Sequence, residues 1–332
     1  MEQAPKQERL DWVDTARGIG IILVVYGHAL RGHVTAGAFD PAWHGDVQDA
    51  VIYSFHMPLF FFLAGLFVRR SLAKGADVFL REKAVTLVYP YFLWSVVSVA
   101  LAVLAAGAVN SPKSIDAILT LWAIPVYQYW FLYALIICQV LALMSQADWR
   151  ITAIFCVISA LGIGASGLGM LTIAISFYLY LGAGILMAPH LATIQRKRNV
   201  VLVVALLAAA AFAVSFLMGE TIGRGRMLDV SRALLGIVAT VGVAMLIAPW
   251  SRGLALLGTA SMAIYVLHTI FSAGLRMALL AIGYSNNLVA LVLGTLIGLA
   301  GPLLVWAVAR HYRLLPWLGL GAQPRIGQER VA

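Results

Sequence analysis

The chain is a succession of long apolar runs separated by short polar stretches. A bilayer-spanning helix needs about 20 such residues. Runs of that size fall at roughly 13–31, 51–68, 84–107, 128–146, 150–166, 170–188, 199–218, 229–249, 254–281 and 288–310. We therefore expect an all-α, polytopic integral membrane protein with about ten transmembrane helices. The fifth run is the weakest, because the glycine-rich stretch after it also fits a re-entrant hairpin with the sixth.

Composition supports a membrane protein. The 332 residues are 62% apolar and 11% charged, whereas soluble domains carry about a quarter charged residues. We expect a single transmembrane domain, 1–317, and a short cytoplasmic tail, 318–332. The first run follows acidic residues rather than the basic leader of a cleavable signal peptide, so we expect this helix to be retained in the protein. Cys138 and Cys156 lie in apolar runs and are interpreted as small buried side chains.

The positions of the basic residues predict the topology. If the N-terminus is cytoplasmic, most of the 23 Lys and Arg residues fall on the cytoplasmic side. Ten spans then place both termini inside, in a multi-pass protein of the inner or plasma membrane. The bias explains the net charge of +9 through contact with membrane lipid, without nucleic acid.

The first apolar run carries the strongest candidate site. In a helix, Arg17 and His28 lie on nearly the same face, about 16 Å apart along the axis. Asp14 precedes Arg17 by one turn and can pair with it. Ionisable residues inside apolar helices usually face a protein interior or a wet cavity. His28 fits either a general base or a structural, hydrogen-bonded histidine.

Other polar residues gather near the ends of later runs. His56 is expected at the outer mouth of the second run, with Pro58 in its first turns, and Pro90 is expected to kink the third. Trp130 fits an aromatic belt as well as a substrate site. Tyr265 and His268 share a helical face, which is also typical of a satisfied polar pair.

Two groups of cations are candidates for binding anions. The loop after the second run carries Arg69, Arg70, Arg81 and Lys83, which could hold the phosphates of coenzyme A or supply ordinary positive-inside charge. On the outer side, Arg224, Arg226 and Arg232 depart from the positive-inside trend. They fit contact with an acidic glycan or simple solvation.

The order of these motifs resembles the membrane acyltransferase-3 family, in particular its fucose 4-O-acetylase and carbohydrate O-acetyltransferase branch. The resemblance covers about residues 10–310 and rests on Asp14-xx-Arg17-Gly18…Gly27-His28, Ser54-Phe55-His56-Met57-Pro58-Leu59-Phe60-Phe61, the basic loop before Pro90-Tyr91, Trp130-Phe131-Leu132 and Gly258-xx-Ser261-xxx-Tyr265-xx-His268. Two positions depart from the family: Ala84 stands where many members have a second loop arginine, and Ala64 where many have serine.

The resemblance implies transfer of an acetyl group from cytoplasmic acetyl-CoA, as co-substrate, to a carbohydrate hydroxyl beyond the membrane. It implies that Arg17 and His28 match the family's essential pair and that the loop around Arg81 and Lys83 holds coenzyme A. We expect Asp14 to orient Arg17, and His28 to act as base or transient acyl carrier. Candidate acceptor contacts are His56, Trp130, Tyr265 and His268.

Other features narrow the mechanism. There is no Gly-x-Ser-x-Gly elbow, so a serine hydrolase mechanism is unsupported. No His/Cys/Asp/Glu grouping has metal-ligand spacing, so we expect no metal. The competing classes are a secondary transporter of a small solute or glycan precursor, and a non-catalytic membrane component. The two halves of the chain share no repeat, which disfavours a transporter. The sequence leaves open the sugar, the acyl group and whether the protein is a homo-oligomer.

Overall fold

The structure, a computed structural model, describes residues 11–36, 45–105, 112–163, 167–218, 225–284 and 286–321. Within these ranges the regular elements are all helical. In chain order they are α1 (Asp11–Thr35), α2 (Gly45–Gly65), α3 (Val68–Leu72), α4 (Ala76–Lys83), the π-helical turn η1 (Ala84–Val88), α5 (Tyr89–Leu104), η2 (Ile115–Thr120), η3 (Tyr127–Tyr129), α6 (Trp130–Met144), α7 (Trp149–Leu161), α8 (Met170–Met187), η4 (Ala188–His190), α9 (Leu191–Arg196), α10 (Arg198–Leu217), α12 (Arg226–Ile247), η5 (Ala248–Trp250), α13 (Arg252–Thr259), α14 (Ser261–Ala281) and α15 (Asn287–His311).

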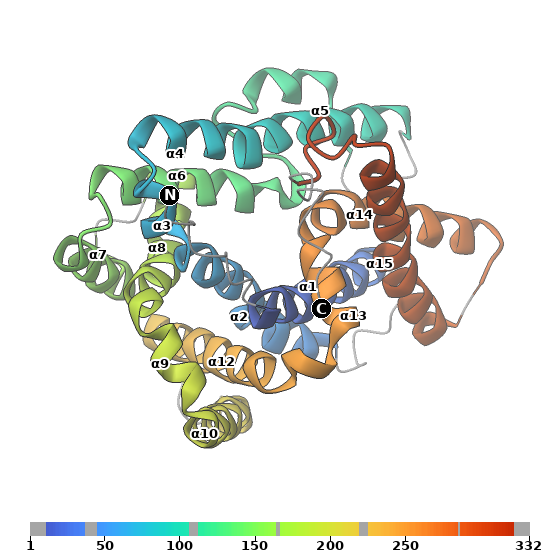
Figure 1. Ribbon diagram of the computed structural model, residues 1–332. Coiled ribbons are helices and arrows are strands. Elements are labelled where there is room, and N and C mark those ends of the chain that lie inside the picture. Colours follow the sequence, from blue (N-terminus) through green and yellow to red (C-terminus); the bar gives the residue numbers. More distant parts are fainter. Residues whose placement is uncertain are drawn as a thin grey trace.

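Helix α1 lies at the centre of the bundle (Figure 1). It packs against α2, α12, α13, α14 and α15, so residues from both ends of the chain surround it. Small residues along α1, including Ala16, Gly20 and Gly27, are buried at these contacts. In lipid, helices associate through close van der Waals packing, which small side chains permit. The helix that carries the candidate site is therefore enclosed by these five helices.

Nine helical stretches among the described residues are long and apolar enough to cross a membrane. This confirms an all-helical, multi-pass membrane protein. The predicted span 150–166 is instead the 13-residue helix α7, about 20 Å long and short of a full bilayer. Its partner is α8, where the Ser159 hydroxyl donates to the Ser176 carbonyl and accepts from the Leu179 amide. Thr152 lies against Gly182. Because 159 meets 176 and 152 meets 182, α7 and α8 are antiparallel.

The predicted single span 254–281 is two helices. The first, α13, ends at Thr259, and α14 begins at Ser261 after Ala260, which is outside both. Two glycines let α13 pack directly on α1. A Cβ at Gly18 would collide with the carbonyl of Leu254, and one at Gly258 with the carbonyl of Asp14. This crossing holds the segment that carries Asp14 and Arg17.

We expect Gly258→Ala to destabilise the protein by about 1–3 kcal/mol, because overpacking against rigid backbone forces the two helices apart. The measurement is thermal unfolding of purified protein in lipid nanodiscs. Gly253→Ala, on the same helix with open space around it, is the matched control and should not lower the melting temperature. Equal melting temperatures for the two variants would contradict this packing.

Both prolines differ from their predicted setting. Pro58 lies inside α2, which begins at Gly45, rather than in the first turns of a helix. Pro90 follows the π-helical turn η1, which joins α4 to α5. A wider turn accommodates a residue that cannot donate a backbone hydrogen bond and re-aims the helix. The expected irregularity of the third span is therefore a π-helical turn, one residue of which, Leu87, faces a cavity.

The segment after α15 packs on the start of α5. Tyr89 donates its hydroxyl to the Trp317 carbonyl at 2.5 Å, and the Trp94 indole donates to the Leu318 carbonyl at 2.9 Å. Leu320 is buried. The first residues of the expected tail thus form part of the bundle, and residues 322–332 lie outside the described ranges.

Candidate active site

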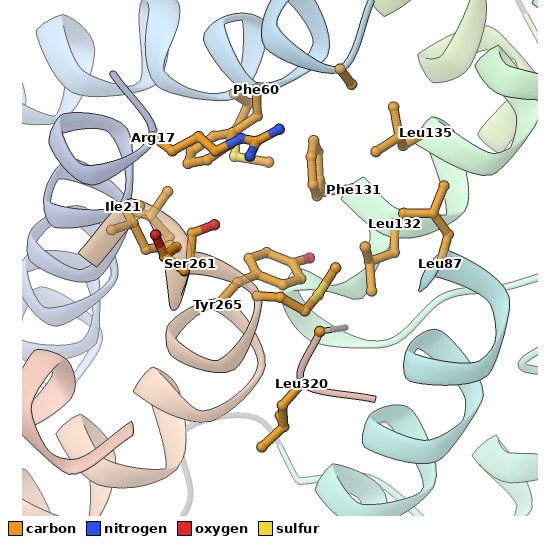
Figure 2. Close-up of a pocket in the computed structure, with 17 residues that line it drawn as sticks. Arg17, Ile21, Phe60, Leu87, Phe131, Leu132, Leu135, Ser261, Tyr265 and Leu320 are labelled. Atoms are coloured by element: carbon orange, nitrogen blue, oxygen red, sulfur yellow. The ribbon is translucent and has the colours of Figure 1, made fainter. Parts of the chain in front are cut away.

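Two cavities open against the face of α1 that carries Arg17 and His28. The first, the Arg17 cavity, has a volume of about 290 Å³ and is mostly apolar (Figure 2). Its lining residues are Arg17, Ile21, Val24, Met57, Phe60, Ala64, Leu87, Phe131, Leu132, Leu135, Gly258, Thr259, Ser261, Met262, Tyr265, Leu320 and Gly321. They come from α1, α2, η1, α6, α13, α14 and the segment after α15.

Arg17 supplies the positive charge of this cavity. Figure 2 shows its side chain extending into the cavity toward Phe131, with Ser261 and Tyr265 below. Its Nη1 lies 3.4 Å from Asp14 Oδ1, which confirms the pair expected from their spacing. The guanidinium also lies 5.7 Å from the centre of the Phe67 ring. A guanidinium held between a carboxylate and an aromatic ring keeps free N–H donors for a second anion.

The second cavity, the His28 cavity, has a volume of about 510 Å³ and is lined by more polar side chains than the first. Its residues are His28, Ser98, Leu101, Ala102, Ala105, Tyr127, Gln128, Thr269, Ile270, Ser272, Ala273, Gly274, Arg276 and Met277. Hydroxyls, an amide, an imidazole and a guanidinium therefore face one space. Such groups can bind the hydroxyls of a sugar, and no carboxylate is among the lining residues.

The two cavities meet across one hydrogen-bonded layer. Tyr265 lines the Arg17 cavity, and its hydroxyl donates to the backbone carbonyl of Gln128 at 2.5 Å. Gln128 lines the His28 cavity, where its side-chain amide donates to the Thr269 hydroxyl at 3.0 Å. Beside them, Tyr129 donates to the Val266 carbonyl at 3.1 Å. We call Gln128, Tyr129, Tyr265 and Thr269 the septum.

His28 lies directly beyond the septum, next to His268. Their ring centroids are 5.1 Å apart. Nδ1 of His268 lies 3.0 Å from the Ile264 carbonyl and 2.8 Å from the Tyr265 carbonyl. Because a carbonyl only accepts, Nδ1 carries the hydrogen, and the buried Nε2 of neutral His268 is an acceptor without a partner in the described residues. His268 can therefore orient a protonated nitrogen of His28.

Tyr265 and His268 do not form the pair with each other that their spacing suggested. Each makes its own hydrogen bonds, Tyr265 to the Gln128 carbonyl and His268, through Nδ1 only, to backbone carbonyls of its own helix. Tyr265 lines the Arg17 cavity, whereas His268 is fully buried against His28 and lines neither cavity. Their neighbours Gln128 and His28 come from η3 and α1 rather than from the shared face of α14.

The other predicted acceptor contacts lie outside both cavities. His56 is 0% exposed, which corrects its expected position at the outer mouth. Its Nδ1 hydrogen bonds the Ile52 carbonyl at 2.6 Å, and Tyr53 packs edge-on against its ring. Trp130 packs at 5.5 Å from the Phe177 ring. Both residues support the bundle around the site.

The basic loop folds into two short helices beside Phe67, the residue that contacts Arg17. Arg69 and Arg70 lie on α3, and Arg81 and Lys83 on α4. Glu82 joins the two helices by accepting from Ser71 at 2.7 Å and from Lys74 at 2.6 Å. These four cations do not line the Arg17 cavity. Arg69 and Arg70 follow Phe67, which contacts Arg17, and Arg81 and Lys83 precede η1, whose Leu87 lines the cavity.

Two of the outer arginines hydrogen bond the ends of neighbouring helices, a role that neither interpretation of them included. Arg226 donates to the carbonyls of Ser159 and Ala160, near the C-terminal end of α7. Arg232 donates to the carbonyl and hydroxyl of Ser215, near the end of α10. Cations here satisfy carbonyls that a helix leaves unpaired. Arg224 lies outside the described residues.

Sequence reasoning assigned no role to Gln128, Ser98 or Arg276. Arg276 carried a usable signal, because an arginine inside an apolar helix usually faces a cavity or a partner. Gln128 and Ser98 carried none, since a single neutral polar residue at the start of a span, like Gln128, or within one, like Ser98, is common. Among the described residues, no cluster of three or more His, Cys, Asp or Glu side chains is placed to hold a metal ion.

Comparison with known proteins identifies the family of the chain. The family model described as "Acyltransferase domain" matches residues 10–307, nearly the whole chain. Nodulation protein NolL of Mesorhizobium japonicum is 31% identical over 134 residues, which is 39% of this chain and 34% of that protein. The matched region thus spans about a third of that relative. No solved structure matches the chain.

Proposed function

Because the chain belongs to the acyltransferase-3 family, we propose that it is a membrane O-acyltransferase that uses acyl-CoA and acylates a carbohydrate hydroxyl. The acyl group we propose is acetyl or another short chain. The observation that carries the proposal is one helix, α1, presenting Arg17 to one cavity and His28 to the next, across a thin septum. Donor and acceptor can enter from opposite sides and meet at His28.

The donor side follows from charge. Arg17 is an anion-binding group in an otherwise apolar cavity, held by Asp14. We assign it to a phosphate of coenzyme A, with Arg69, Arg70, Arg81 and Lys83 binding further phosphates outside the cavity. The extended, mostly apolar pantetheine arm then runs along α1. Arg17 and His28 are about 16 Å apart along the axis, a distance that an extended arm must cover.

The chemical step takes place at His28. Neutral His28 accepts the proton of the acceptor hydroxyl while the oxygen attacks the thioester carbonyl carbon. The new C–O bond forms, the C–S bond breaks, and the thiolate of coenzyme A takes the proton from His28. The same ring could instead carry the acyl group between donor and acceptor. His268 stabilises the protonated ring in the first route by accepting its N–H.

The septum has to open for this reaction. The thioester reaches His28 only if the Tyr265 hydroxyl leaves the Gln128 carbonyl or the two residues move together. The closed septum keeps water on the acceptor side away from the thioester when no acceptor is bound. Exclusion of water from a reactive intermediate is a common role of such closures.

The test is turnover of acetyl-CoA by the purified full chain in lipid nanodiscs. We expect release of free coenzyme A, with transfer of labelled acetyl groups to carbohydrate acceptors and none in empty nanodiscs. Succinyl-CoA in a parallel reaction measures the choice of acyl group. A folded protein that neither binds nor consumes acyl-CoA would contradict the proposal. Uptake of solutes into vesicles would then favour a secondary transporter.

The cellular setting belongs to the same proposal. We place the protein in the cell's inner or plasma membrane, with both termini cytoplasmic and the His28 cavity facing outward. This orientation counts α7 with the nine longer helices: although short, it runs antiparallel to α8 and returns the chain toward the outer side. The carbohydrate is then a cell-surface or exported glycan. Tagging either terminus with a reporter that is active on one side of the membrane tests this orientation.

A further inference from the structure

One charged residue of the His28 cavity has no role in the reaction described above. Arg276 lies on α14 and lines the cavity together with His28. Only 8% of its surface is exposed, and its Nε has no hydrogen-bond partner among the described residues. The guanidinium is therefore buried, and its Nε–H donor is unpaired next to the space where we place the acceptor.

No carboxylate in the described part of the chain forms an ion pair with Arg276. The neighbouring arginines are different: Arg17 pairs with Asp14, and Arg31 pairs with Asp49 at 2.5 and 2.8 Å. A buried cation without a counter-charge costs several kcal/mol. A protein keeps such a residue at low cost if a bound ligand supplies the anion.

The guanidinium lies close to the reacting centre. A Cβ at Gly32 would collide with Nη1 of Arg276, so the absence of a side chain at Gly32 makes room for it. Gly32 follows His28 by one helical turn, about 6 Å along α1. A ligand that places a hydroxyl at His28 and an anionic group at Arg276 therefore carries both on one sugar or on two neighbouring units.

We propose that the acceptor is anionic, and that Arg276 recognises a carboxylate or phosphate on the sugar that is acylated or on its neighbour. This inference rests on the proposed function and adds the chemical class of the acceptor. A guanidinium binds either anion through two parallel N–H donors. The hydroxyls of Ser98, Thr269 and Ser272 lie in the same cavity and suit the neutral hydroxyls of the sugar.

The experiment measures binding, so that it does not depend on turnover. The full chain in phosphatidylcholine nanodiscs is titrated with glucose, glucuronate and glucose 6-phosphate, and saturation-transfer NMR reports the affinity of each sugar. We expect one or both charged sugars to bind at least about 10-fold more tightly than glucose, the worth of a charge-assisted hydrogen bond. The two charged probes separate a carboxylate from a phosphate acceptor.

Variants identify the residue that gives this preference. Arg276→Gln should abolish it and Arg276→Lys should retain part of it. Gly32→Ala keeps the charge but displaces the guanidinium, so it should also weaken the preference. Arg226→Gln removes an outer arginine that does not line the His28 cavity, and it should leave the preference unchanged. Circular dichroism verifies that each variant is folded.

Three results would overturn the proposal. The first is equal binding of charged and neutral sugars by the folded wild type. The second is a charge preference that survives in Arg276→Gln. The third is loss of the preference in nanodiscs that contain anionic phosphatidylglycerol, which would assign Arg276 to a lipid headgroup. Acyl-CoA turnover in the same samples tests the enzyme separately, so a failed anion site and a failed acyltransferase give different results.

Discussion

Replacing His28 with Ala is expected to lower the rate of acyl transfer by about 10²–10⁴-fold, the usual contribution of a general base. The ring lies beside His268 and is the one imidazole among the described residues that line the His28 cavity. The variant should still bind acyl-CoA, because the donor's anionic groups are held at the Arg17 end of α1. The measurement combines acyl transfer in nanodiscs with equilibrium binding of the donor.

Added imidazole separates chemistry from structure in this experiment. The His28 cavity of about 510 Å³ can admit a small imidazole in place of the missing ring. Partial recovery of the rate in His28→Ala would assign the loss to the base. His190→Gln, an exposed histidine outside both cavities, is the matched control and should behave as wild type. Full activity of His28→Ala would remove His28 from the mechanism.

The mass of the protein after incubation with acetyl-CoA distinguishes the two roles of His28, acyl carrier and general base. If His28 carries the acyl group, wild type incubated with acetyl-CoA and no acceptor should gain the mass of one acetyl group, and the His28→Ala variant should not. If His28 is only a base, neither protein gains mass. Either result is compatible with the loss of rate, so the mass measurement decides between the two routes.

Removing the charge of Arg17 should act on the donor instead. We expect Arg17→Gln to raise the KM for acyl-CoA by about 10- to 100-fold, since a charged hydrogen bond contributes about 1.5–3 kcal/mol. Arg17→Lys should recover part of this loss, because it keeps the charge but not the planar fork. The measurement is the dependence of the initial rate on acyl-CoA concentration.

The control for Arg17 is Arg196→Gln. Arg196 is exposed at the end of α9, on the side of the membrane where the predicted topology places Arg17. It should leave the KM unchanged. Asp14→Asn should raise the KM less than Arg17→Gln, because Asp14 only positions the guanidinium, at 3.4 Å. An unchanged KM in Arg17→Gln would place the donor elsewhere.

The helix content and the central position of Arg17 and His28 could be predicted from local patterns. A run of about 20 apolar residues has to satisfy its backbone hydrogen bonds within itself, so hydropathy alone predicts a helix. The eleven-residue spacing of Arg17 and His28 fixes them on one face once the segment is helical, and α1 is unbroken from Asp11 to Thr35. The pair of Asp14 with Arg17 followed from the same periodicity.

Breaks inside apolar segments could not be predicted in the same way. The residues around Ala260, Gly258-Thr259-Ala260-Ser261, are small and carry no charge, so a continuous helix tolerates them and hydropathy does not distinguish one long helix from two short ones. The break exists because α13 packs across α1 through Gly18 and Gly258. Likewise, the short helix α7 is fixed by its hydrogen bonds to α8 rather than by its own length.

The composition of the site depended most on tertiary structure. His268 is far from His28 in sequence, yet their rings lie 5.1 Å apart, and Tyr265 reaches the carbonyl of Gln128 on another helix. Among the arginines on the predicted outer side, Arg226 and Arg232 bond helix ends, whereas Arg276 faces the cavity. Their residue type and predicted side are the same, so only their neighbours distinguish them.

The sequence by itself thus determined a helical membrane bundle and placed the two candidate residues of α1 on one face, because both follow from patterns within one segment. The tertiary structure decided which residues share the two cavities, what closes the septum and which buried arginine lacks a counter-charge. In lipid most faces of a helix are apolar, and the choice of partner depends on close packing of small residues and a few interhelical hydrogen bonds. Those contacts join distant segments, and no local pattern of the sequence encodes them.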